Sequence, residues 1–92
     1  MTEPPDDMRL GALLDRILRH ATIEGMRRQS HAAWSACVTP HRIADAIHGR
    51  SPLSIDAVRK IAIAYGDRTM PYGSLVDAAT LYRWMIAARE RH

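Results

Sequence analysis

Apolar residues recur at intervals of three and four along most of this chain, the spacing that places side chains on one face of a helix. Five segments show the pattern, and no segment alternates apolar and polar residues as a strand would. We therefore predict an all-α fold, a compact five-helix domain with one core. The apolar positions of the first predicted helix are Leu10, Leu13, Leu14, Ile17, Leu18 and Ala21.

The middle of the chain combines the end of one helix with the start of another. The second predicted helix runs to about Ala36, and Thr39 is a suitable N-cap for the next. Pro40 suits a first helical position, where its missing N–H is not needed, and Gly49 is a typical C-terminal stop. These residues predict a third helix over 40–48, whose buried positions are Ile43, Ala46 and Ile47.

The boundaries of the first two helices are less well marked. Asp6 or Asp7 is a candidate cap for the first helix. Gly25 indicates its end or a kink, while Thr22 is an alternative start for a longer second helix. Ser54 caps the fourth predicted helix and Gly66 ends it; the expected inward residues are Ile55, Val58, Ile61, Ala62 and Tyr65.

The fifth predicted helix, residues 75–89, is apolar over more than one face. Ser74 and Asp77 resemble a capping box at its start. Two interpretations of its apolar surface stay open, ordinary burial against the other helices and a homodimer interface anchored by Tyr82 and Trp84. The residues assigned to the dimer interface are Leu81, Tyr82, Trp84, Met85 and Ala88.

Charge is distributed unevenly between the start of the chain and the rest. The chain has 92 residues, enough for one domain, and residues 1–7 are expected to form a disordered acidic tail before a domain over 8–92. Twelve of the 13 basic residues are arginine, and the net charge is +3. The basic excess favours an anionic partner such as nucleic acid, while the arginine preference is also compatible with a GC-rich genome.

Several classes of protein are disfavoured by composition. No apolar run approaches the roughly 18 residues of a membrane span, and the N-terminus lacks the features of a secretory signal. A single cysteine, Cys37, fits a reducing compartment, so we expect a cytoplasmic protein. Cys37 with His31, His41 and His48 fits no closed metal site, and no catalytic base is evident. We therefore expect neither an enzyme nor a metal or other cofactor.

The segment from Gln29 to Gly49 resembles the helix-turn-helix of the lambdoid phage repressor and Cro family, also called Xre-type. Gln29 stands at the family's glutamine at the start of its second helix, Ala33 at the small contact residue, and Val38 at the apolar turn residue. Cys37 replaces the usual turn glycine, so the turn is expected to be less left-handed or slightly strained. Ala32 and Ala36 replace larger residues, and Trp34 is the candidate to fill that space.

The resemblance implies a sequence-specific regulator that binds double-stranded DNA. The helix over 40–48 would enter the major groove. The residues expected to read bases are His41, Arg42, Ala44 and Asp45. An ion pair between Arg42 and Asp45 is the alternative role of those two residues. The residues expected to contact phosphates are Arg27, Arg28, Gln29, Thr39, His48 and Arg50.

The expected mode of action is repression by a homodimer that occupies a near-palindromic operator. Small family members often belong to phages, prophages, plasmids or toxin–antitoxin operons, which implies a bacterial cell or phage-infected host and association with the nucleoid. The main alternative is a protein-interaction module, such as an antitoxin-type partner that binds through the apolar helix over 75–89.

Overall fold

Five α-helices and one short 3-10 helix make up the regular structure of the computed structural model, which describes residues 8–21, 23–66 and 77–91. The predicted all-α class is confirmed, because these residues contain no β-strand. The predicted tail over 1–7 and the alternative cap Thr22 lie outside the described residues. The elements are α1 (Leu10–Arg19), η1 (Glu24–Arg27), α2 (Gln29–Ala36), α3 (Pro40–Ile47), α4 (Ile55–Tyr65) and α5 (Ala78–Glu90).

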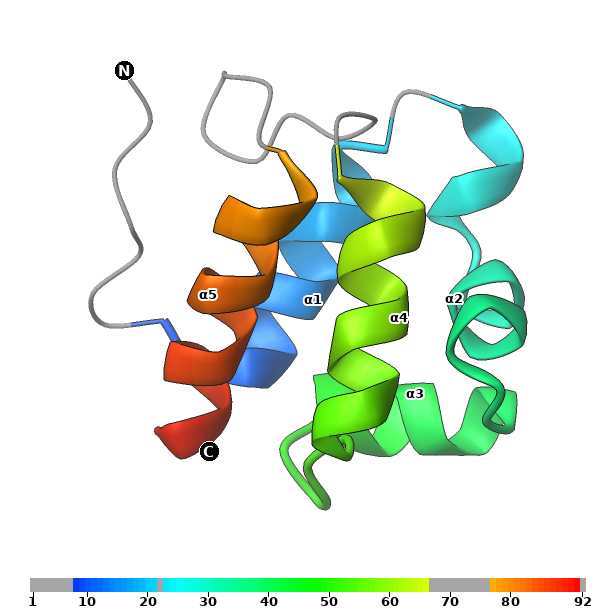
Figure 1. The fold of residues 1–92 in the computed structure, drawn as a ribbon. Coiled ribbons are helices and arrows are strands. Elements are labelled where there is room, and N and C mark those ends of the chain that lie inside the picture. The colour runs from blue at the N-terminus through cyan, green and yellow to red at the C-terminus, as the bar shows by residue number, and fades with distance from the viewer. Residues whose placement is uncertain (1–7, 22, 67–76, 92) are drawn as a thin grey trace.

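Helix α3 lies across one end of the bundle formed by the other helices (Figure 1). Helices α4 and α5 pack side by side, α1 contacts α5, and α2 packs on α4 away from α5. Helix α3 contacts α1 and α2. It therefore covers the end of the core with one face and leaves its opposite face toward solvent. No helix in the described part of the chain has the length and apolarity to cross a bilayer.

Every apolar position predicted for the first helix is buried in the core. Arg9 is the N-cap of α1 and provides no side-chain cap. Asp6 and Asp7, the predicted caps, lie outside the described residues. The core cluster contains Leu10, Leu13, Leu14, Ile17, Leu18, Ala21, Met26, Ala32, Ala33, Ala36, Ile43, Ala46, Leu53, Ala57, Val58, Ile61, Ala62, Tyr65, Leu81, Trp84, Met85 and Ala88.

Helix α4 is capped as predicted but is rotated slightly from its predicted orientation. The Ser54 hydroxyl accepts a hydrogen bond from the backbone N–H of Ala57 at 3.1 Å. Ile55, expected in the core, is 51% exposed, and Ala57 is buried in its place. The small alanine allows α4 to approach its neighbours closely, whereas an isoleucine in the first turn reaches past the end of the core.

Helix α5 begins three residues later than predicted. Asp77 is its N-cap and accepts a hydrogen bond from the backbone N–H of Thr80 at 2.7 Å, so Asp77 does not belong to the first turn. Ser74 and Leu75, the predicted start, lie outside the described residues. Near the other end, the Arg89 side chain donates to the Leu53 carbonyl at 2.7 Å and thereby holds the loop that follows α3.

The apolar surface of α5 is mostly core. Leu81, Trp84, Met85 and Ala88 are buried by the other helices of the same chain. Their assignment to a dimer interface is therefore wrong, since they cannot reach a second copy without opening the domain. Tyr82, the fifth residue assigned, is half-buried and packs against the edge of the core.

Candidate nucleic-acid interface

The turn between α2 and α3 is a left-handed helix end. Cys37 has φ 58° and ψ 40°. Its N–H donates to the Trp34 carbonyl at 3.2 Å, and the N–H of Val38 donates to the Ala33 carbonyl at 3.0 Å. This pair of bonds is the Schellman motif, which usually has glycine at the left-handed position. Cysteine was expected to make the turn either less left-handed or slightly strained. Because the turn is fully left-handed at Cys37, the structure supports the strained turn.

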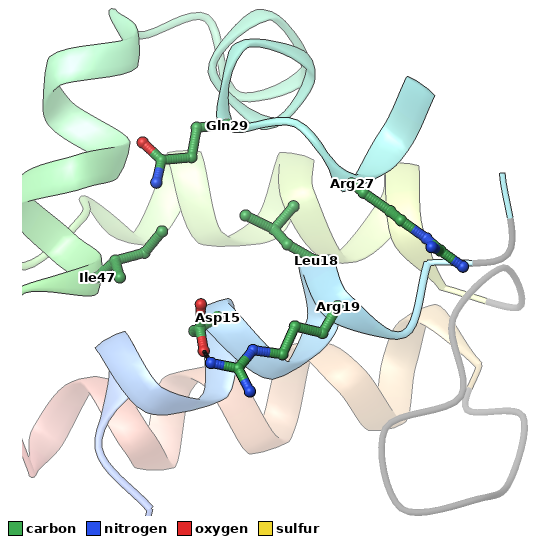
Figure 2. Close-up of a pocket in the computed structure, with 6 residues that line it drawn as sticks. All are labelled: Asp15, Leu18, Arg19, Arg27, Gln29 and Ile47. Atoms are coloured by element: carbon green, nitrogen blue, oxygen red, sulfur yellow. Dashed lines mark ion pairs between the residues drawn. The ribbon is translucent and has the colours of Figure 1, made fainter. Parts of the chain in front are cut away.

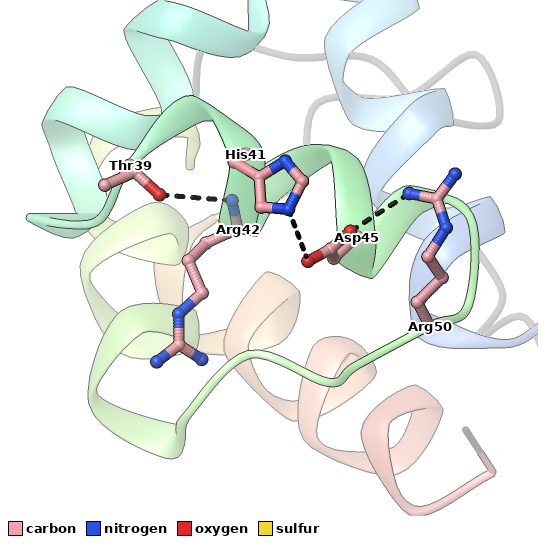
Figure 3. Close-up of polar contacts among 5 residues, drawn as sticks. All are labelled: Thr39, His41, Arg42, Asp45 and Arg50. Atoms are coloured by element: carbon pink, nitrogen blue, oxygen red, sulfur yellow. Dashed lines mark hydrogen bonds and ion pairs between the residues drawn. The ribbon is translucent and has the colours of Figure 1, made fainter.

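The start of α3 follows the sequence prediction. The Thr39 hydroxyl accepts a hydrogen bond from the backbone N–H of Arg42 at 3.3 Å, and Pro40 is the first helical residue (Figure 3). A short turn and a side-chain cap therefore define the direction in which α3 leaves α2.

The end of α3 repeats the motif found at the end of α2. Gly49 has φ 75°, and its N–H donates to the Ala46 carbonyl at 3.2 Å. The N–H of Arg50 donates to the Asp45 carbonyl at 2.8 Å. The helix itself ends at Ile47, one residue earlier than predicted, with His48 as its C-cap. The Schellman geometry brings Arg50 back beside the last turn of α3.

The contact between α1 and α3 depends on Gly11, a residue that was not predicted to matter for packing. A Cβ atom at Gly11 would lie 2.5 Å from the carbonyl oxygen of Ala46 and would also overlap that of Ile47. Only glycine permits this approach, so Gly11 sets how closely the last turn of α3 packs on α1. The sequence offered one signal of this close contact, a small residue beside Leu10 in an otherwise apolar stripe.

Trp34 does not fill the space left by the alanines of α2. Its side chain is 78% exposed, whereas Ala32 and Ala36 are buried. The prediction is wrong because α2 approaches its neighbours closely enough for alanine side chains to complete the packing. The tryptophan is on the outward side of α2 and is the most exposed of the large apolar residues in the described ranges.

The outward face of α3 presents two exposed cationic or titratable side chains, His41 and Arg42. Ala44 and Asp45 are half-buried on the same helix. The Arg42 guanidinium points away from Asp45 (Figure 3), and within the described residues it has no hydrogen bond or ion pair. The predicted Arg42–Asp45 pair is therefore wrong.

Asp45 pairs instead with the residues on either side of it (Figure 3). Its Oδ1 accepts from Arg50 Nη1 at 3.0 Å, and its Oδ2 lies 3.4 Å from His41 Nε2. The Asp45 side chain is only 18% exposed, whereas the His41 side chain is 82% exposed. One carboxylate thus lies between two groups that can carry positive charge.

The residues predicted to contact phosphates are all exposed, but they do not form one continuous cluster of free groups. Arg28 and Gln29 lie at the start of α2. The Arg27 Nε donates to the Ala21 carbonyl at 3.1 Å, and its guanidinium lies 3.6 Å from Glu24. Arg27 is therefore already engaged within the chain. The remaining exposed members of the predicted set are Thr39, His48 and Arg50.

A surface hollow of about 320 Å³ separates the start of α2 from α1 and the end of α3 (Figure 2). Asp15 and Arg19 form an ion pair of 3.0 Å on its α1 side. The Gln29 amide lies at the opposite side of the hollow, toward Ile47. Gln29 is therefore positioned near the end of α3. The remaining lining residues are Leu18 and Arg27.

A buried hydrogen-bonded chain fixes α2 against α4. The Tyr65 hydroxyl donates to the Met26 carbonyl at 2.8 Å, and His31 Nδ1 lies 2.8 Å from the same hydroxyl. Because the single hydroxyl proton is used on Met26, His31 Nδ1 must donate. Burial raises the pKa of Tyr65 to about 12. The helical spacing predicted Tyr65 only as an apolar position and gave no indication of this polar role.

The described residues contain no group of three or more histidine, cysteine, aspartate or glutamate side chains arranged to hold a metal ion. On α4, hydrogen bonds and charge from Arg59 and Lys60 lower the pKa of Asp56, which is exposed. What the arrangement offers chemically is a helix face with hydrogen-bond donors and positive charge.

Comparison with protein-family models, with curated proteins and with solved structures finds no match to this chain.

Proposed function

We propose that this protein is a sequence-specific regulator that binds double-stranded DNA through α3 and represses transcription by occupying an operator. The observation that carries the proposal is the placement of α3. It lies across one end of the domain, between two left-handed turns, with Ile43 inward and His41 and Arg42 outward. A helix with one exposed face, like α3, fits the major groove of B-DNA.

The exposed side chains of α3 have different capacities for reading bases. The Arg42 guanidinium has no hydrogen bond or ion pair within the described chain, and a guanidinium can pair bidentately with guanine O6 and N7. His41 can donate to guanine, and Ala44 suits a thymine methyl group. Arg42 is therefore the residue on which we expect base discrimination to depend most.

Phosphate contacts would orient the domain on the duplex. The exposed residues Arg28 and Gln29 at the start of α2 and Thr39 at the start of α3 suit this role. His48 and Arg50, after α3, are candidates for the other side of the groove. Arg27 is a weaker candidate, because its Nε is already used on the Ala21 carbonyl.

A near-palindromic operator would require two copies of the domain with their α3 helices about 34 Å apart. The homodimer stays part of the proposal. Since the α5 stripe is buried within the single chain, the two copies would meet through another surface.

The first test is selection of bound sequences from random duplex DNA. We expect a consensus containing guanine, arranged as two inverted half-sites. Arg42→Ala should then weaken binding to the selected site by about 5- to 150-fold, the loss of one bidentate base contact. Each phosphate contact should contribute roughly 0.9 to the slope of log affinity against log salt.

A matched control is Arg83→Ala, which removes the same charge from an exposed position on α5. We expect this variant to bind the selected site within a few-fold of the parent. No enriched sequence, or equal losses in the two variants, would contradict base reading by α3. Affinity that does not change with salt would contradict DNA binding altogether.

A protein-interaction module is the second candidate, and Trp34 now favours it in place of α5. Tryptophan is enriched among the residues that dominate protein interfaces, and Trp34 is exposed on α2. The two candidates separate in one measurement. A protein that selects no DNA sequence, but elutes from gel filtration with a protein partner that Trp34→Ala releases, would support the second.

A further inference from the structure

We infer that Asp45 is a specificity-determining residue that suppresses binding to unrelated DNA by pairing with Arg50 and His41 in the free protein. The inference rests on the proposed function and deepens it. The structural basis is one half-buried carboxylate held between Arg50 Nη1 at 3.0 Å and His41 Nε2 at 3.4 Å.

The Asp45–Arg50 pair is built by the backbone as well as by the side chains. The Arg50 N–H donates to the Asp45 carbonyl at 2.8 Å, and the left-handed Gly49 makes that bond possible. Both ends of Arg50 are thus fastened to Asp45, one through the main chain and one through the guanidinium. This pairing therefore requires less loss of side-chain freedom than a pair formed across an open surface.

The pair changes the energetics of contact with a phosphate backbone. Arg50 can give its full charge to a phosphate only by leaving Asp45, and the exposed part of the carboxylate repels the same phosphate. On unrelated DNA no group replaces Arg50 as the partner of the Asp45 carboxylate. At a matching site a cytosine N4 amino group can donate to the carboxylate, which keeps it satisfied while Arg50 and His41 turn to the DNA.

Asp45 is therefore expected to favour half-sites that place a cytosine beneath the middle of α3. The predicted partner is a duplex with guanine facing Arg42 and cytosine facing Asp45. The carboxylate does not add much affinity, because it opposes the phosphates. Its contribution is to the difference in affinity between matched and unmatched DNA.

The test compares Asp45→Asn with Asp56→Asn in binding to the selected site and to an unrelated duplex. Asp56 is a matched control, because it also pairs with two cations, Arg59 at 2.9 Å and Lys60 at 3.0 Å, on α4. Freeing Arg50 for one phosphate should tighten unrelated binding of Asp45→Asn about eightfold at roughly 0.1 M salt and steepen its salt slope by roughly 0.9.

The affinity of Asp45→Asn for the selected site should rise less, so the ratio of the two affinities should fall by several-fold. Asp56→Asn should change both affinities by the same small factor. Adding Arg50→Gln to Asp45→Asn should remove the gain on unrelated DNA, which identifies Arg50 as the cation released. Circular dichroism would show that each variant retains the parent's helical content.

Equal changes in discrimination for Asp45→Asn and Asp56→Asn would overturn the inference, since net charge alone would then explain the effect. A gain that persists with Arg50→Gln would also overturn it. Both results leave DNA binding by the parent intact, whereas a parent that selects no sequence refutes the proposed function itself.

Discussion

Replacing Cys37 with glycine should stabilise the protein. Cys37 has φ 58° in the Schellman turn, and its side chain is exposed, so the substitution removes little packing. A non-glycine residue in this conformation costs roughly 1–2 kcal/mol. Glycine adds roughly 0.4–1 kcal/mol of unfolded-chain entropy that folding must overcome. The difference leaves a gain of about 0.5–1 kcal/mol, or about 2–8 °C in Tm for a domain of this size.

The assay is urea and thermal unfolding followed by circular dichroism, with a reducing agent present to keep the thiol free. Cys37→Ala is the matched control, because it removes the thiol but keeps the Cβ atom responsible for the strain. We expect that variant to stay within about 0.5 kcal/mol of the parent, as is usual for exposed positions. If Cys37→Gly is no more stable than Cys37→Ala, the proposed strain at the turn does not exist.

Two further predictions concern the packing beneath α3 and the buried tyrosine. Gly11→Ala should lower the free energy of unfolding by roughly 1–3 kcal/mol, because the new methyl group overlaps the Ala46 carbonyl; Gly25→Ala, with no atom within 4 Å of its added Cβ, should not. Equal stability of the two variants in urea would refute the tight α1–α3 contact. The pKa of Tyr65 is raised to about 12 in the folded protein, so above pH 10 the unfolded chain loses the Tyr65 hydroxyl proton before the folded chain does. The free energy of unfolding should therefore fall as the pH rises from 10 to 12. Tyr65→Phe should reduce this pH dependence and should also lower the stability at pH 7 by about 1–3 kcal/mol, because the Met26 carbonyl loses its hydrogen-bond donor. An unchanged stability curve over that pH range would contradict the burial of the hydroxyl.

Local signals in the sequence were sufficient for the helix-turn-helix segment. Thr39 as cap, Pro40 as first helical residue and Gly49 as left-handed stop were each predicted from residue type and were each found. These signals act over one or two turns of chain, so one sequence is enough to recognise them. The same holds for the inward stripe of α1, whose spacing admits only one buried face.

Contacts between helices were not predictable in this way. Ile55 is more apolar than Ala57, yet the alanine is buried because α4 needs a small residue there. Asp45 had Arg42 three residues away as an obvious partner, but the left-handed turn at Gly49 brought Arg50 closer. The apolar surplus of α5 indicated burial without indicating what would cover it, and the covering surface turned out to be the chain's own core.

Because of the two left-handed turns, the placement of α3 does not depend on which residues occupy its outward face. The backbone motifs at Cys37 and Gly49 hold its ends, and Ile43 anchors its inward face, while His41 and Arg42 contribute nothing to the core. Under the proposed function, substitutions at those outward positions would therefore change the DNA sequence that α3 reads without a large penalty in folding. The domain would then act as a scaffold on which new DNA-binding preferences arise through a few changes in a single turn of helix.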